Sequence, residues 1–438
     1  MRKTILKTVL FCAAILLFSN SMLAQKEGNR LVDTLTYEQH MGLPAAASKV
    51  YGTDKSWAIS GFGESNYNHY FGEKNRESGD LELYNTQLQR FVLYGAYKPV
   101  DWMVLYAEFF AEFMNDGTEE YDFEYFPEFF IDFLFDKYFN LRIGTHQPGI
   151  GYINNNDEPI LFYTVNRPEV ERMLIPSQWI DLGVMTYGHI GDDFKWSASV
   201  YQGLDAENLN GSTWMRRGRD KALRFNFDSY LLNTKFMYNG IKNTELSISG
   251  FYSPVGLGNQ IEVNGNPLDV RADTYLGSAY ARYTHKNLSI MALGVYGQTR
   301  NTDQLFELTR DSDIGPQVIG KEVWGFYTEL SYDILPLLGF KKDKPDAKEP
   351  NFFINRREFK LPVFARLERL DTHSGIHAAL ANENYSRSNL TALALGANFN
   401  TKRNIVFKAN YQFRWNKEPM MNGELEGDRF EVGFGFIF

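Results

Sequence analysis

Residues 101–113 read DWMVLYAEFFAEF, and every odd-numbered position from Met103 to Phe113 is apolar. The even-numbered positions of the same stretch include Glu108 and Glu112. A period of two places these two sets on opposite faces of a β-strand, whereas a helix would show a period near 3.6. The stretch therefore predicts a strand that is apolar on one face and carries charge on the other.

The same alternation recurs along most of the chain. It is clear at 129–135, 139–143, 405–415 and 430–438, and about sixteen such segments begin near residues 56, 82, 101, 128, 138, 179, 194, 230, 244, 274, 287, 322, 358, 389, 404 and 428. The stripes run about 9–11 residues, the length that a tilted strand needs to cross a bilayer. The alternative interpretation is a soluble sandwich or barrel with a wet outer face.

The connections between these segments alternate between short and long. Short ones lie near 98–100, 136–137, 191–193, 239–243, 285–286 and 401–403, and long ones near 68–81, 115–127, 148–178, 205–229, 255–273, 299–321, 372–388 and 417–427. Outer-membrane barrels have short periplasmic turns and long external loops, so we predict an all-β fold, a transmembrane antiparallel β-barrel of about 16 strands. Residues 334–357 break the rule. Either these residues form a long polar periplasmic connection, or the expected number of strands is wrong by two.

The start of the chain reads differently. Three basic residues among the first seven precede an apolar run at 9–18, and Ala24 offers a cleavage site, so residues 1–24 are predicted to be a secretory signal peptide. Residues 25–55 show no alternation and are predicted to be a periplasmic N-terminal segment. Residues 56–438 are then the barrel domain.

Composition excludes several classes of protein. The formal net charge of −9 argues against a nucleic-acid binder, and 44% apolar with 23% charged residues is not the composition of a disordered chain. The mean hydropathy of −0.37 argues against a bundle of membrane helices. The single cysteine, Cys12, falls in the predicted signal peptide. We find no cofactor fingerprint, and His373 and His377 lack a third metal ligand, so no cofactor or metal is expected.

Several short motifs point to one family. They are LPAAASKVY at 43–51, ISGFGE at 59–64, RIG at 142–144, NNDEP at 155–159, RPEVER at 167–172, IPSQW at 175–179 and YQGLD at 201–205. The chain resembles in these stretches the broad family of outer-membrane porins related to the phosphate-selective porin O/P type. The terminal Phe438, with aromatic residues two and four positions earlier, is similar to the signal that the barrel-assembly machinery reads.

The resemblance implies a non-enzymatic, water-filled channel in the outer membrane of a Gram-negative bacterium, often a homotrimer, through which small hydrophilic solutes diffuse. Its partners would be outer-membrane lipid, lipopolysaccharide and the barrel-assembly machinery. The resemblance also implies that the loop 148–178 folds inward and narrows the pore. Gly149 and Gly151 permit a sharp entry to this loop, and four prolines stiffen it.

The strand phase and the loop together predict the pore-lining residues, all of them charged or titratable. Rings and clusters of such side chains set the ion preference of a pore. The basic candidates are Arg142, His146, Arg167, Arg172, Lys235, Arg366, Lys408 and Arg414, and the acidic ones are Glu108, Glu112, Glu128, Asp132, Glu169 and Glu171. The alternative is that these side chains pair across strands and only solvate the wall. A basic cluster at 214–221 is expected to fold over the mouth, to bind lipopolysaccharide phosphates, or to be a solvated loop.

The basic candidates in and beside the loop favour anions such as phosphate, whereas the acidic faces at 101–113 and 128–132 favour a mixed, weakly selective pore. Two other functions are compatible with a barrel. One is an outer-membrane enzyme of the protease or lipase type, with His69 or His373 as a base at the rim. The other is a structural or adhesin-like barrel with a blocked lumen.

Overall fold

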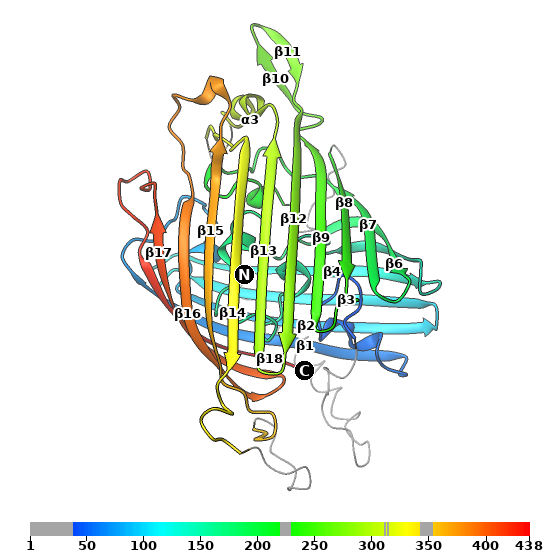
Figure 1. The fold of residues 1–438 in the computed structure, drawn as a ribbon. Coiled ribbons are helices and arrows are strands. Elements are labelled where there is room, and N and C mark those ends of the chain that lie inside the picture. The colour runs from blue at the N-terminus through cyan, green and yellow to red at the C-terminus, as the bar shows by residue number, and fades with distance from the viewer. Residues whose placement is uncertain (1–37, 220–228, 311, 313–314, 342–353) are drawn as a thin grey trace, which may run out of the picture.

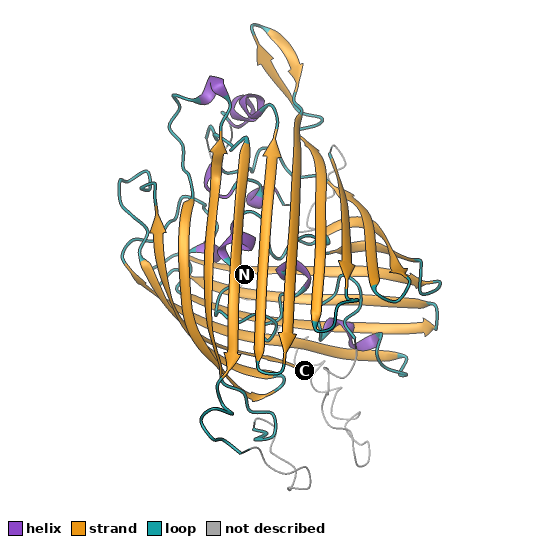
Figure 2. Ribbon diagram, viewed as in Figure 1, coloured by secondary structure: helices purple, strands orange, loops and turns teal. Residues whose placement is uncertain are grey.

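The computed structural model describes residues 38–219, 229–310, 312, 315–341 and 354–438, so the predicted signal peptide lies outside the described residues. Within them, sixteen antiparallel strands close into a barrel, as Figures 1 and 2 show. The predicted fold class and strand number are confirmed. Each strand pairs with its sequence neighbours in the wall, and β1 pairs with β18 to close the seam.

The wall strands are those that the alternation marked. Their bounds are β1 Trp57–Phe71, β2 Gln87–Val100, β3 Met103–Asn115, β4 Tyr121–Leu134, β5 Asn140–His146, β6 Asp181–Ile190, β7 Phe194–Gln202, β8 Tyr230–Tyr238, β9 Thr244–Val255, β12 Ala272–His285, β13 Leu288–Thr299, β14 Glu322–Asp333, β15 Pro362–Gly375, β16 Asn389–Lys402, β17 Ile405–Asn416 and β18 Asp428–Ile437. A small hairpin, β10 Gln260–Val263 and β11 Asn266–Asp269, stands apart from the wall.

Helices are short in the described residues. The α-helices are α2 Glu169–Met173 and α3 Thr302–Thr309, and the 3₁₀ helices are η1 Ala47–Val50, η2 Leu81–Leu83, η3 Ile153–Asn155, η4 Gly211–Thr213, η5 Arg216–Gly218 and η6 Ala378–Leu380. None of these described helices is long and apolar enough to cross a membrane.

The last residue of the chain completes the seam. The Phe438 N–H donates to the Gly61 carbonyl at 2.9 Å, and the Gly61 N–H donates to the Phe438 carbonyl at 3.1 Å. The Phe438 ring stacks on Phe91 of β2. Backbone pairing thus continues round the circumference, as it must where no water reaches the wall.

The predicted strand phase is correct. Phe109, at the centre of β3, has 48% of its surface exposed on the outside of the barrel, while its neighbours Glu108 and Phe110 are buried inside. The outer wall is therefore a band of exposed apolar side chains, the face that a barrel turns to lipid.

The two ends of the barrel differ as expected. Short turns lie at the lower end in Figure 1, and long loops, with the β10–β11 hairpin and α3, lie at the upper end. The long connection after β14 also lies at the lower end. Because β14 pairs directly with β15, no wall strand is missing between them, and the strand count needs no correction.

The interior is filled by two segments. The loop between β5 and β6 folds into the barrel, and its apolar side chains pack on the inner faces of β9 and β12–β15. The described part of the predicted periplasmic segment, residues 38–55, lies partly inside the barrel. Its middle, including η1, enters the lower end and packs on β1 and β2.

We predict that an Arg in place of Phe109 will destabilise the barrel by about 2–4 kcal/mol, because the charge would lie in the middle of the lipid-facing band. The same change at Tyr121, an exposed residue where β4 begins, should cost about 0–1 kcal/mol because it lies near the membrane surface. Urea-induced unfolding in lipid vesicles measures both. Equal losses for the two variants would contradict this placement of the outer face.

Candidate functional site

The predicted constriction loop connects β5 to β6 and lies inside the barrel (Figure 1). Several of its side chains are fully buried, namely those of Ile150, Glu158, Glu171 and Leu174. Gly151 adopts φ +63°, and a side chain on it would meet a carboxylate oxygen of Glu171 at 2.7 Å, so glycine is required at this turn. The inward fold of the loop, predicted from the resemblance and from its glycines, is confirmed.

Apolar packing fixes one side of this loop. Val170 and Leu174 of the α2 region lie against Gly325 of β14, whose missing side chain makes room for them. Leu174 and Trp179 belong to the same buried cluster as Phe251 and Tyr327 of the wall. The loop therefore rests on the wall that runs from β9 to β15.

Three predicted wall cations bind the loop. Lys235 of β8 donates to the Gly151 carbonyl at 3.1 Å. Lys408 of β17 donates to the carbonyls of Phe162 and Thr164 at 2.8 and 3.0 Å. Arg366 of β15 donates to the Thr164 hydroxyl at 2.5 Å. These side chains point inward as predicted, and each one anchors loop atoms.

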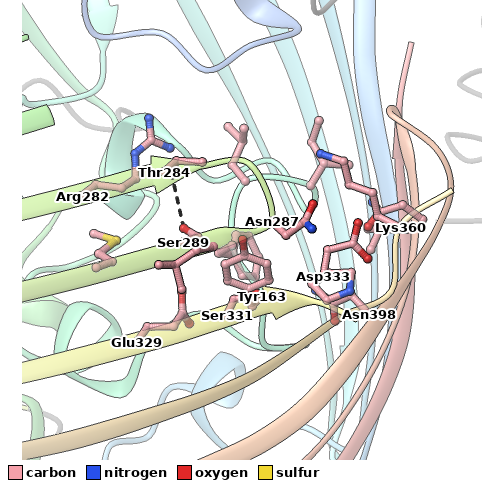
Figure 3. A pocket seen from close by; sticks show the side chains of 18 of the residues that line it. Tyr163, Arg282, Thr284, Asn287, Ser289, Glu329, Ser331, Asp333, Lys360 and Asn398 are labelled. Atoms are coloured by element: carbon pink, nitrogen blue, oxygen red, sulfur yellow. Dashed lines mark hydrogen bonds between the residues drawn. The ribbon is translucent and has the colours of Figure 1, made fainter. Parts of the chain in front are cut away.

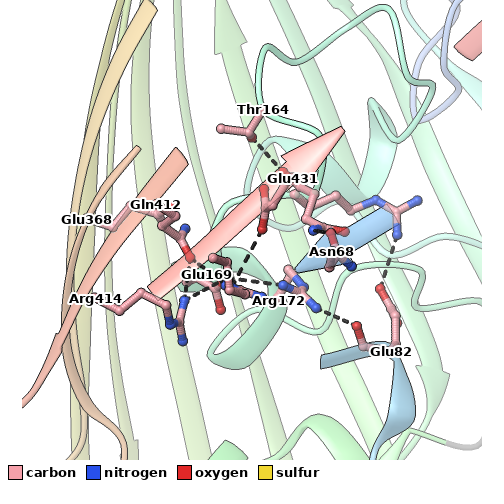
Figure 4. Close-up of polar contacts among 12 residues, drawn as sticks. Asn68, Glu82, Thr164, Glu169, Arg172, Glu368, Gln412, Arg414 and Glu431 are labelled. Atoms are coloured by element: carbon pink, nitrogen blue, oxygen red, sulfur yellow. Dashed lines mark hydrogen bonds and ion pairs between the residues drawn. The ribbon is translucent and has the colours of Figure 1, made fainter. Parts of the chain in front are cut away.

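Glu169 is the centre of the charged anchor on the β17–β18 side (Figure 4). Its carboxylate pairs with Arg414 at 3.2 Å, with Arg172 at 3.1 Å and with Arg429. Arg172 also donates to the Glu82 carbonyl at 2.5 Å. Burial raises the pKa of Glu169, but Arg429, Arg414 and Arg172 outweigh it and hold that pKa below its ordinary value. Glu169 is therefore ionised at neutral pH.

Glu171 joins the two arms of the loop. It accepts hydrogen bonds from the N–H groups of Tyr152 and Ile153 at 2.8 and 2.7 Å, and from the Tyr327 hydroxyl at 2.7 Å. Arg167 pairs with Glu82 at 3.3 Å. Glu171 and Arg167 are both predicted constriction residues, and each of them holds the loop in its inward position.

The predicted acidic wall lies on the other side of the lumen. Glu108 of β3 and Glu128 of β4 face each other in register. Glu112 pairs with Arg90, and Asp132 accepts two hydrogen bonds from Arg142, at 2.9 and 2.8 Å. The wall therefore contains both ion pairs and facing carboxyl groups, since Glu112 also lies opposite Glu124 in the register.

His146 completes the predicted set. Its Nδ1 lies 2.9 Å from the Tyr201 hydroxyl inside the barrel. Every predicted pore-lining side chain is thus buried inside the barrel, and most are tied to a partner. The contribution of each of them to conduction stays a prediction.

The external basic cluster at 214–221 folds inward in its described part, which ends at Arg219. Arg216 is fully buried, pairs with Asp80 at 2.7 Å and with Glu82, and donates to the Arg172 carbonyl at 2.6 Å. The cluster therefore packs onto the constriction loop from above. Asp220 and Lys221 lie outside the described residues.

A cavity of about 600 Å³ lies between the loop and the inner faces of β12–β17, towards the lower end of the barrel (Figure 3). Its basic lining residues are Arg282, Lys286, Arg357, Lys360, Arg366 and Arg403, and its acidic ones are Glu329, Asp333 and Glu358. Tyr152, Tyr163, Asn287, Ser289 and Asn398 supply further polar groups. The basic excess comes partly from turn residues such as Lys286 and Lys360, which strand phase alone does not assign to the lumen.

Comparison with known proteins identifies the fold. No family model matches the chain, so membership of the phosphate-selective porin O/P family stays a prediction. An uncharacterized protein of Aquifex aeolicus (strain VF5) is 26% identical over 382 residues, which cover 86% of this chain and 79% of the relative.

Two solved structures share the architecture. OmpF of Salmonella typhi, in complex with daunomycin, has a TM-score of 0.51 at 10% identity and covers 87% of this chain and 97% of its own. The outer membrane channel DcaP of Acinetobacter baumannii has a TM-score of 0.50 at 11% identity with the same coverage. The chain has the fold of porins, a closed antiparallel β-barrel of sixteen strands in its described residues.

We predict that Glu169→Gln will cost about 3–5 kcal/mol of stability, because it leaves buried guanidinium groups without their shared counter-charge. The loss is measured by urea-induced unfolding. Glu307→Gln removes a comparable but exposed Glu–Arg pair, three residues apart at the C-terminal end of α3, and should cost less than about 1 kcal/mol. Equal losses would contradict the anchoring role of Glu169.

The same pairs predict a pH dependence. Because the folded-state pKa of Glu169 is lowered, its stabilisation is fully present above the unfolded value of about 4.3 and is lost as the pH falls through the lower folded value. The difference between wild type and Glu169→Gln should therefore be the same at pH 7 and pH 5. A difference that already shrinks between these two pH values would contradict this charge state.

Proposed function

We propose that the chain is a porin, a passive diffusion channel for small hydrophilic solutes, and that it prefers anions. The observation that carries this proposal is the cavity below the constriction loop and its excess of basic side chains. Arg282 pairs with Glu245 at 3.4 Å but keeps about a third of its side chain exposed, 34%, and Lys360 is exposed at the lower edge of the cavity. Charges on low-dielectric walls concentrate counter-ions in the water between them.

The acidic residues oppose this preference less than their number suggests. Asp132 is paired with Arg142, and Arg90 pairs with both Glu112 and Glu64, so part of this negative charge is balanced. Glu329, inside the cavity, lies 3.4 Å from Arg366. Anions such as phosphate are therefore the candidate solutes, in line with the family resemblance. The similarity of the fold to that of the outer membrane channel DcaP supports the proposal of a channel, without indicating a solute.

An enzymatic function finds little support at the rim. Both ring nitrogens of His373 are engaged, Nε2 with the Val318 carbonyl at 2.9 Å and Nδ1 with the Thr372 hydroxyl at 3.0 Å. His69 lies exposed on the outward face of β1. His373 therefore has no free ring nitrogen, and His69 does not face the lumen.

A barrel with a blocked lumen is the second candidate. The space beside Arg90, Arg167 and Arg172 is only about 10 Å³, which is roughly the room that one water needs. Single-channel recording in planar bilayers separates the two functions. The porin gives stable current steps, and a blocked barrel gives none. A homotrimer, contacts with lipopolysaccharide and insertion by the barrel-assembly machinery stay predictions of the resemblance.

We predict that the double variant Arg282→Glu, Lys360→Glu will shift the reversal potential in a salt gradient towards cations, because it inverts two charges in the proposed water path. The shift should weaken in high salt, since both side chains reach water. Arg310→Glu is the matched control: Arg310 is exposed just after α3 and outside the cavity, so this variant should change the reversal potential little. An unchanged reversal potential in the double variant would contradict the proposed path.

A further inference from the structure

The inner faces of β1, β2 and β3 carry a patch of apolar side chains, which a water-filled lumen does not explain. Phe62, Val92, Tyr94, Tyr106 and Phe110 all point inward from β1, β2 and β3, and each has at most 2% of its surface exposed. Apolar side chains are buried in this way only where other apolar atoms cover them. Something inside the barrel must therefore cover this part of the wall.

The cover is the segment 39–52. Leu43, Ala46 and Ala47 of this segment belong to the same buried cluster as the aromatic wall residues. Val50 packs with Ala58 of β1 and Val104 of β3 in a second cluster nearby. The segment thus forms a continuous apolar contact with the inner faces of the first three strands.

Hydrogen bonds join the segment to the constriction loop. The Ala46 N–H donates to the Glu158 carboxylate at 2.7 Å, and the Asn155 side-chain amide donates to the Gly42 carbonyl at 3.3 Å. On the wall side, the Ser60 hydroxyl donates to the Ala46 carbonyl at 2.6 Å. The motifs at 43–51 and 155–159 are therefore in direct contact.

An aromatic pair anchors both ends of the segment. His40 and Tyr51 stack with ring centroids 3.6 Å apart. The His40 Nε2 lies 2.8 Å from the Tyr187 hydroxyl of β6, and the Tyr51 hydroxyl donates to Asp132 of β4. The segment consequently reaches across the lower end of the barrel from β6 to β1.

We propose that residues 39–52 form a fixed internal partition that closes the β1–β6 side of the lower mouth and confines ions to the cavity along β12–β17. This inference rests on the proposed channel function. The partition covers the side on which Glu108 and Glu128 face each other, so a passing ion meets the basic cavity and is kept from these carboxyl groups. The segment is thereby a determinant of selectivity.

The test compares the full chain with two variants that remove the cover. One lacks residues 40–51, and the other carries Ala47→Asp, which puts a charge into the apolar contact and leaves the strands intact. Ser56→Asp, an exposed change just before β1, is the matched control. Both cover variants should raise the single-channel conductance and shift the reversal potential towards cations, and the control should do neither.

A cysteine reporter gives a second readout that does not depend on current. Ala58→Cys lies under the partition, so it should resist a water-soluble thiol reagent in the full chain and react in the chain lacking 40–51. Ser289→Cys, in the wall of the open cavity, should react in both. Fast reaction at position 58 in the full chain would overturn the partition, as would unchanged conductance and selectivity in both cover variants. Absence of current steps from the full chain would instead overturn the proposed channel function.

Discussion

The inside of this barrel depends on one constraint, that a charged side chain taken out of water must meet a partner. Burying an unpaired charge is far more costly than burying a paired one. The wall of the barrel carries cations such as Lys235, Lys408 and Arg414, and the loop supplies carbonyl oxygens and Glu169 to meet them. The loop is held inside because the wall charges need it, and the wall charges are tolerated because the loop is there.

This mutual dependence divides the lumen. The loop rests on the wall from β9 to β15 through apolar contacts and is anchored at β17 and β18 through Glu169, while residues 39–52 cover the first strands. The cavity of about 600 Å³ lies beneath the loop, and Arg282 and Lys360 line it. Selectivity in such a pore follows from which charges still face water, and the total charge of the chain, −9, says little about it.

The positions of the strands and the faces of their side chains could be predicted because apolar residues recur with a period of two in stretches such as 101–113. The β10–β11 hairpin was missed, although Asn264 and Gly265, both with positive φ, are a strong turn signal for a two-residue hairpin. Strand phase shows that Lys408 faces inward, but it does not show whether water or a loop carbonyl meets it there. That depends on how a distant segment folds, and the spacing of residues does not contain it.

The N-terminal segment was the least predictable part. Its apolar residues Leu43 and Val50 follow no period, because they contact a wall that residues far along the chain build. A signal was nevertheless present in the strands. Tyr106 and Phe110 share the inner face of β3 with Glu108, and a water-filled lumen does not account for the aromatic side chains in this mixture.

On the proposed path, ions cross on the β12–β17 side of the lumen. Crystals of the full chain soaked separately in bromide and in rubidium salts would locate the ions directly by anomalous scattering. An ion path along β12–β17 predicts bromide in the cavity beside Arg282 and Lys360, and neither ion beside Glu108 and Glu128. Rubidium between those two carboxylates, with no bromide in the cavity, would contradict it.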